Sequence, residues 1–241
     1  MKNELLAELN AERAARRPVI VVTEVPTGAQ RLVKIADFAG DPLAAELDRQ
    51  LRMGKSGMIE AAGRKLFLTV HAPVARLVVT GAVHISQALA PLARSLDYDV
   101  TIVDPRTAFA SPERFPDIAL IAEWPDAALP PLNIDRYTAF VALTHDPKID
   151  DPALLHALAR ECFYIGALGS RKTHAKRVER LKAQGASEAA LARIHSPIGL
   201  AIGAVSPAEI AVAIMAEITA VLRLPREAGH APAAAVTGTA A

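Results

Sequence analysis

From residue 74 onward, short uninterrupted apolar runs alternate with stretches of helical period, and this alternation restricts the fold more than any other feature of the sequence. The apolar runs lie at 76–81, 98–104, 118–124, 138–145 and 161–169, and the helical stretches at 84–96, 151–160, 171–185, 187–195 and 206–223. A strand covered on both faces reads as a continuous apolar run, and strand–helix–strand units build parallel sheets. We therefore expect an α/β fold with a doubly wound parallel sheet.

The residues before this region have a different pattern. It predicts a helix over 2–17 that ends at Pro18, paired strands over 18–25 and 29–36, a helix over 41–54 and a last strand over 63–73. We expect a small α+β N-terminal domain over 1–73, the main domain over 74–224, and a disordered tail over 225–241, which is rich in Ala, Pro, Gly and Thr.

Composition excludes several classes of protein. The 241 residues include 27 Lys+Arg and 26 Asp+Glu, so a net charge of +1 argues against generic nucleic-acid binding. One cysteine, Cys162, excludes a disulfide framework and suggests a reducing compartment, so we expect a cytoplasmic protein. No apolar run reaches the roughly 18 residues of a membrane span, and the first residues do not resemble a signal peptide.

Ligands of doubly wound sheets bind beyond the carboxyl ends of the strands, so the residue after each strand is informative. After the first of these strands comes Gly81-Ala82-Val83-His84-Ile85-Ser86, where a dinucleotide fingerprint would carry three glycines and only Gly81 is present. Asp104 ends the next strand, where an acidic residue would bind a ribose. One reading is an NAD(P)-dependent oxidoreductase with a degenerate fingerprint; the other is a strand–helix turn without that ligand.

Thr144-His145-Asp146 follows another buried strand. His145 and Asp146 could bind a polar ligand or exchange protons. They could equally be turn residues, with Asp150 or Asp151 capping the next helix. No further His or Cys stands at metal-ligand spacing, so we assign no metal site.

The strongest local signal is Gly166 and Gly169 followed by Ser170 as a helix N-cap. Backbone N–H groups and the helix dipole favour an anion at such a start. The cations that follow oppose the usual charge preference there, which suggests an anionic partner; they are Arg171, Lys172, Lys176 and Arg177. A solvated basic face is the alternative, with Glu179 supplying local compensation.

The segment 195–203 places Pro197 and Gly199 in an apolar loop, which could form a wall beside the ligand or be a simple connection. Cys162 opens a buried strand and is expected to be inert core. Ser206, Pro207 and Glu209 form the start signal of the last helix.

Several of these segments together resemble the XdhC/CoxI family. Residues 163–172 are similar to its YIGxxGSR(R/K) motif, and Thr144-His145-Asp146 resembles its THD segment. A second signature resembles 194–203 followed by Pro207, Glu209, Ile210 and Ala211. Gly81, Ala82 and His84 match the family's GAGHV turn, with Val83 and Ser86 in place of the usual glycines, and Val103, Asp104 and Arg106 resemble its VDDR motif.

The resemblance implies a Rossmann-like fold and an accessory chaperone without catalytic residues. Such proteins bind the molybdenum cofactor (molybdopterin or its dinucleotide form), keep it during sulfuration and deliver it to a molybdenum hydroxylase apoenzyme of the xanthine dehydrogenase type. A cysteine desulfurase would be a second partner, and the sequence leaves a homodimer open. The expected cofactor-binding residues are Gly81, His84, Asp104, Arg106, His145, Asp146, Gly166, Gly169, Ser170, Arg171, Lys172, Pro197 and Gly199.

The first domain departs from the family. Full-length members usually carry a Gly-Gly-Cys-x-Glu segment, but Gly40-Asp41-Pro42-Leu43 stands near that place here. This domain therefore offers no thiol ligand to molybdenum. Two alternatives from other classes are the oxidoreductase described above and a scaffold that only contacts the hydroxylase.

Overall fold

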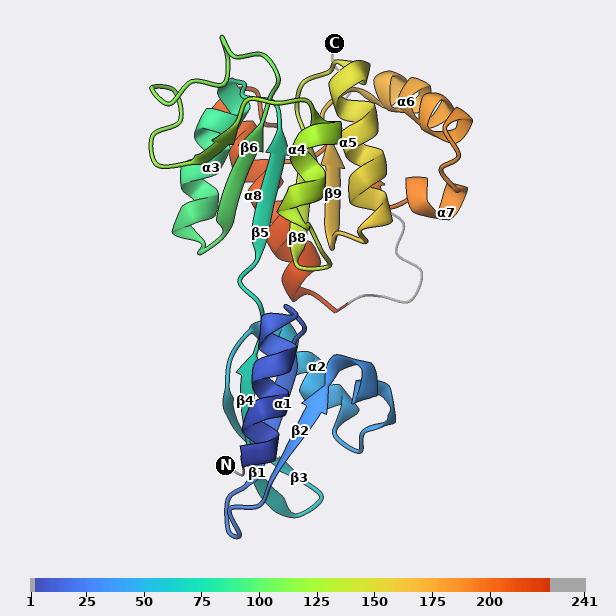
Figure 1. Ribbon diagram of the computed structural model, residues 1–241. Coiled ribbons are helices and arrows are strands. Elements are labelled where there is room, and N and C mark those ends of the chain that lie inside the picture. Colours follow the sequence, from blue (N-terminus) through green and yellow to red (C-terminus); the bar gives the residue numbers. More distant parts are fainter. Residues whose placement is uncertain (1–2, 226–241) are drawn as a thin grey trace. The chain divides into compact units, whose positions relative to one another are not determined.

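The computed structural model describes residues 3–225, which divide into two units (Figure 1). The smaller unit comprises residues 3–73 with 223–225, and the larger unit comprises residues 74–222. Apart from Pro225, the tail predicted to be disordered lies outside the described residues. Within the described chain, no helix is both long and apolar enough to cross a membrane.

The smaller unit is built on an antiparallel sheet in the order β2-β1-β4-β3. Its strands are β1 (Val19–Glu24), β2 (Gln30–Lys34), β3 (Gly57–Ala61) and β4 (Arg64–His71); its helices are α1 (Asn3–Ala14), the 3-10 helix η1 (Ile35–Gly40) and α2 (Ala44–Met53). Successive β1 side chains alternate between the two faces. Val19 and Val21 join the cluster of Leu9 on α1, while Ile20 and Val22 join that of Leu47 on α2.

The larger unit contains a six-stranded sheet in the order β10-β9-β8-β5-β6-β7, and every pairing in it is parallel. The strands are β5 (Arg76–Thr80), β6 (Asp99–Val103), β7 (Ala119–Ile121), β8 (Thr138–Ala142), β9 (Tyr164–Ala167) and β10 (Ile194–His195). Numbered within this unit from β5, the order is 3-2-1-4-5-6, that of a Rossmann fold. The predicted fold class is confirmed.

Helices lie over both faces of this sheet (Figure 1), and a hydrophobic cluster fills each interface. One cluster joins alternate strand residues such as Val79 and Val141 to α3 (His84–Ser95) and α8 (Pro207–Arg223). The other joins Val78 and Phe140 to the helices of the opposite face, α4 (Pro125–Leu132), α5 (Pro147–Ala159), α6 (Arg171–Ala183) and α7 (Glu188–Leu191). Burial on both faces explains the continuous apolar runs.

Most predicted helix starts are confirmed, and one is corrected. Ser170 caps α6 by accepting from Thr173 N–H, and Ser206 and Glu209 form the reciprocal bonds expected at the start of α8. In contrast, α5 begins at Pro147 rather than 151, because Asp146 is its N-cap and accepts from Lys148 N–H. Asp150 and Asp151 therefore lie inside the helix, where both are buried.

Candidate functional site

The turns after β5 and β8 meet at the point where the strand order reverses. We call residues 81–86 the β5 turn and residues 144–146 the β8 turn. Gly81 has a φ of +111°, and a Cβ atom added to it would lie 3.0 Å from Thr144 Cγ2. Only glycine permits this approach, so Gly81 is required for the two turns to touch. Rossmann folds bind their ligands at this edge of the sheet.

Asp104 lies beneath the β5 turn and is fully buried. Its Oδ2 accepts from Ala82 N–H at 2.8 Å and from Arg106 Nη2 at 2.7 Å. Its Oδ1 accepts from the backbone N–H and Nε of Arg106, at 3.0 and 2.9 Å. With all four acceptor positions occupied, Asp104 cannot bind a ribose in this arrangement. The expected ligand contact becomes a support for the turn and for Arg106.

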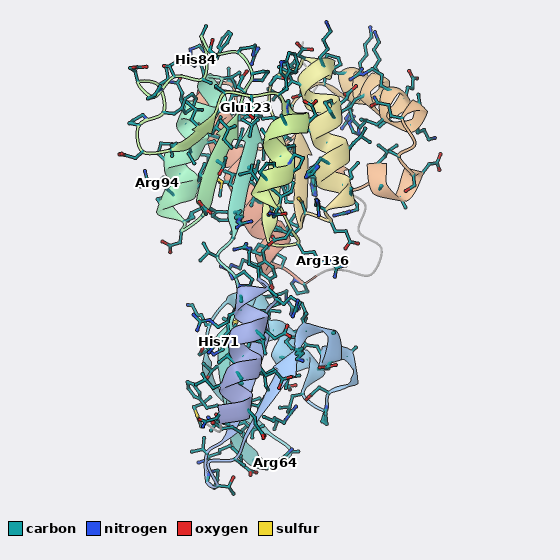
Figure 2. The ribbon with its side chains drawn as sticks, viewed as in Figure 1. Arg64, His71, His84, Arg94, Glu123 and Arg136 are labelled. Atoms are coloured by element: carbon teal, nitrogen blue, oxygen red, sulfur yellow. The ribbon has the colours of Figure 1, made fainter. Side chains whose placement is uncertain are left out.

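Ser86 occupies the place of the third fingerprint glycine. Its hydroxyl donates to Gly81 O and accepts from Val83 N–H at 3.3 Å. The N–H groups of Gly81, Ala82 and Val83 are thus all bonded within the protein, and the branched Val83 stands where a pyrophosphate would approach. His84 is exposed at the start of α3, at the other end of that helix from Arg94 (Figure 2). This local structure argues against a standard dinucleotide site.

The β8 turn is held from beneath by Asp150, a residue that the sequence suggested only as a cap. Asp150 accepts from Thr144 Oγ1 at 2.7 Å and from His145 N–H at 3.0 Å. Burial raises the pKa of this carboxyl, and the hydrogen bonds from Thr144 oppose that rise. His145 is exposed with a φ of +64°, and Asp146 is half-buried. Both predicted residues therefore reach the ligand edge.

Residues 168–172, which we call the β9 turn, join β9 to α6 beside the β8 turn. Arg171 and Lys172 are exposed, whereas Arg177 is only 2% exposed and lies behind the turn. Arg177 Nη2 donates to Leu168 O at 2.7 Å, while its Nε and Nη1 are buried without a partner among residues 3–225. Burial lowers the pKa of this guanidinium, and the charges of Asp150 and Asp151 oppose that effect.

Arg106 connects the β5 turn electrostatically with the β8 turn. Its hydrogen bonds to Asp104 raise its pKa, and the charges of Asp146 and Asp150 act in the same direction. The structure therefore places Arg106 near the β8 turn, and the hydrogen bond from Leu168 N–H to Ala142 O holds the β9 turn beside the end of β8.

Pro197 belongs to a loop on the opposite face of the sheet, against α8. A Cβ atom on Gly166 would lie 2.5 Å from Ile198 Cδ1, and one on Gly199 would lie 3.0 Å from the Ala213 backbone. These two glycines are therefore needed for packing of the loop. Beneath it, Glu217 accepts from Tyr164 Oη at 2.5 Å and from Gly199 N–H at 2.8 Å, and it contacts His195 Nδ1 at 3.0 Å.

Replacing Gly199 with alanine is expected to destabilise the larger unit by about 2 kcal/mol, because the new methyl group meets α8 and φ is +88°. Urea unfolding followed by fluorescence of Trp124, the chain's one tryptophan, measures this loss. Gly203→Ala is the matched control, because φ there is +76° but no atom of residues 3–225 lies within 4 Å of the added carbon. Equal losses in both variants would refute the contact with α8 as the cause.

Cys162 is fully buried, as expected, and burial raises its pKa to about 12. It is the chain's one cysteine, so no reactive thiolate is available from this sequence. Among residues 3–225, no group of three or more His, Cys, Asp or Glu side chains is arranged to hold a metal ion.

Sequence reasoning named Arg177 and Asp150 but did not predict their burial, and it did not name Glu217, although helical spacing carried a signal for each. Arg177 lies four residues before the buried Leu181, and Asp150 lies four before the buried Leu154. Glu217 similarly falls three residues after the buried Ile214 on α8. A charged residue on the apolar stripe of a helix must find a buried partner or ligand.

Comparison with known proteins gives consistent matches for the larger unit. Residues 77–218, more than half of the chain, match the XdhC Rossmann domain. The chain is 34% identical over 155 residues to the uncharacterized protein YqeB of Escherichia coli (strain K12), covering 64% of this chain and 28% of YqeB.

Two further relatives have functional names. Identity is 32% over 154 residues with a protein of Bacillus subtilis (strain 168) named as a probable xanthine dehydrogenase subunit, covering 64% of this chain and 44% of that protein. Identity is also 32% over 149 residues with the molybdenum cofactor insertion chaperone PaoD of Escherichia coli (strain K12), covering 62% of this chain and 41% of PaoD. The chain thus spans less than half the length of these curated relatives.

A solved structure resembles the chain more fully. The crystal structure of a xanthine dehydrogenase from Bacillus halodurans matches with a TM-score of 0.63, covering 94% of this chain and 66% of that one. Sequence identity is 24%, so this likeness supports the fold alone.

Proposed function

The chain belongs to the XdhC family, and we propose that it binds the molybdenum cofactor and delivers it to a molybdenum hydroxylase of the xanthine dehydrogenase type. The observation that carries this proposal is the β9 turn, with a helix start, exposed cations and the buried Arg177 behind it. Such a site suits the phosphate or pyrophosphate of the cofactor. The name of the relative PaoD supports the same ligand.

The residues fit the phosphate part of the cofactor better than its metal. Gly169, Ser170, Arg171 and Lys172 would surround the phosphate group, while His145 and Asp146 would border the rest of the ligand. Cys162 cannot reach molybdenum, because it is fully buried. The chain would therefore hold the cofactor through its organic part, and the cofactor itself would supply all metal chemistry.

The proposed partners follow from this role. A molybdenum hydroxylase apoenzyme would receive the cofactor, and a cysteine desulfurase would supply sulfur while the cofactor is held. We assign no catalytic residue to the chain. The buried, fully bonded Asp104 and the occupied β5 turn argue against an NAD(P)-dependent oxidoreductase.

Identification of the bound molecule tests the proposal. The protein is purified from cells that make molybdenum cofactor, oxidised, and examined for pterin fluorescence; calorimetry with NAD(P) is done in parallel. We expect pterin in near-stoichiometric amount and no tight NAD(P) binding. Absence of pterin together with tight NAD(P) binding would overturn the proposal in favour of the oxidoreductase.

Removal of a cation at the β9 turn should weaken the bound state. Lys172→Ala and Arg171→Ala are each expected to reduce cofactor affinity about tenfold or more, because a charge-assisted hydrogen bond contributes about 1.5–3 kcal/mol. Retained pterin is measured after stepwise dilution. Arg94→Ala is the control, since Arg94 lies at the far end of α3 from the ligand edge (Figure 2). Unchanged affinity in both test variants would place the anion elsewhere.

A further inference from the structure

The β8 turn uses all of its backbone donors internally. The N–H groups of Thr144 and His145 donate to the Asp150 carboxylate at 3.4 and 3.0 Å, and that of Asp146 donates to Thr144 Oγ1 at 3.0 Å. Within residues 3–225, the carbonyl oxygens of Thr144 and His145 and one carboxylate oxygen of Asp146 accept no hydrogen bond. This turn therefore presents acceptors to a ligand.

The β9 turn has the opposite polarity. Leu168 N–H donates to Ala142 O at 2.8 Å, and Leu168 O accepts from Arg177 Nη2 at 2.7 Å. The backbone N–H groups of Gly169, Ser170 and Lys172 donate to no other residue in the described chain. This turn therefore presents donors to a ligand, at the positive end of the α6 dipole.

The buried guanidinium of Arg177 is a second and independent sign of an anion there. The nearby carboxylates are otherwise engaged: Asp151 is bonded by Arg180 at 2.6 and 2.9 Å, and Asp150 is bonded by the β8 turn. Two guanidinium nitrogens of Arg177, Nε and Nη1, remain buried without a partner in the described part of the chain. The charges of Asp150 and Asp151 act on Arg177 from nearby, but they leave these two nitrogens unbonded; such buried donors are costly, and an oxyanion at the β9 turn would offset that cost.

We infer that these two turns determine the orientation of the ligand, with its oxyanion at the β9 turn and a 2-amino-4-oxopyrimidine edge at the β8 turn. The inference rests on the proposed function, since the cofactor carries both groups. Strands β8 and β9 are adjacent, with Ala142 opposite Ala167, so one small molecule can contact both turns. The unbonded carboxylate oxygen of Asp146 and the neighbouring carbonyl oxygens can accept from the N–H donors of such an edge, and the negative charge of Asp146 repels an anion.

Separate probes for the two ends test this orientation in the purified full chain. Inorganic pyrophosphate probes the oxyanion site, and neutral pterin without a phosphate probes the pyrimidine site, each by isotope-edited NMR titration. Arg177→Met is expected to reduce the affinity for pyrophosphate at least tenfold and to leave the affinity for pterin unchanged. Asp146→Asn keeps an acceptor for the α5 cap. It is expected to reduce the affinity for pterin about tenfold and not to reduce the affinity for pyrophosphate.

Controls keep the test decisive. Arg94→Met removes a cation from the opposite edge and should alter neither titration. If Arg177→Met fails to fold, Lys172→Ala replaces it, because Lys172 is exposed and should show the same selective loss. Equal weakening of both probes by either variant, or no binding of either probe by the wild type, would overturn the orientation. The two claims fail separately. If the orientation is overturned but pterin still copurifies, the proposed function remains supported. If no pterin copurifies, the proposed function loses its support even where pyrophosphate binds selectively.

Discussion

Replacing Asp104 with alanine is expected to lower the free energy of unfolding of the larger unit by about 3–5 kcal/mol. The change removes four hydrogen bonds and leaves Ala82 N–H and the half-buried Arg106 guanidinium without their acceptor. A loss of this size is expected because the Ala82 N–H stays buried without an acceptor and the half-buried guanidinium loses its counter-ion. Urea unfolding followed by Trp124 fluorescence measures the change.

Asp99→Ala is the matched control for that loss. Asp99 opens β6, the strand that Asp104 follows, but its side chain is 64% exposed and it meets Arg76 only at 3.9 Å. A change below about 1 kcal/mol is expected, as for exposed ion pairs. A comparable loss in the two variants would contradict the supporting role of Asp104.

The pH dependence of the Asp104 effect has a definite sign. Burial alone would raise the pKa of this carboxyl, but hydrogen bonds from Arg106 and Ala82 outweigh burial and hold the pKa below its usual value of 3.8. A lowered folded-state pKa gives stability that is present above the unfolded pKa and is lost as pH falls through the folded one. The difference in free energy of unfolding between wild type and Asp104→Ala should therefore narrow below about pH 4. Urea unfolding at a series of pH values measures it.

The strands and helices of the larger unit were largely predictable because both faces of its sheet are covered. Continuous apolar runs predicted β5, β6, β8 and β9, and capping residues predicted the starts of α6 and α8.

Other elements were not predicted. The strand β3 of the smaller unit was missed because Met58 is exposed and Glu60 interrupts the pattern. Three prolines in residues 125–132 concealed α4, although Pro125 opens it.

Tertiary pairing explains one wrong boundary. The pattern predicted a helix over 187–195, but α7 ends at Leu191 and residues 194–195 form β10. Ile194 lies opposite Ile165, so the final strand is specified by the neighbouring β9 rather than by local sequence.

The candidate site was predictable only on its exposed side. Glycines, an N-cap and neighbouring cations indicated the β9 turn from sequence alone. Burial of Arg177 and Asp150 depends on how α5 and α6 lie on the sheet, which local spacing suggests but does not determine. The same limit applies to Asp104, whose position predicted a ligand contact although its hydrogen bonds make it a support.

Replacing Glu217 with alanine is expected to lower the free energy of unfolding of the larger unit by about 3 kcal/mol. Tyr164 Oη and Gly199 N–H both donate to Glu217 Oε2, and the change leaves these groups without their acceptor. Burial raises the pKa of Glu217, but hydrogen bonds from His195 and Tyr164 outweigh that effect and lower it. Its contribution should accordingly be lost as pH falls below about 4, in the same unfolding measurements.

A double-mutant cycle separates the contact with Tyr164 from the other bonds of Glu217. Tyr164→Phe removes only the buried hydroxyl and should cost less than Glu217→Ala, because the carboxylate keeps Gly199 and His195. The two changes together should cost less than their sum, since each removes the same 2.5 Å hydrogen bond. Strict additivity would mean that this bond contributes nothing to stability, and that Glu217 acts only through the loop at Gly199.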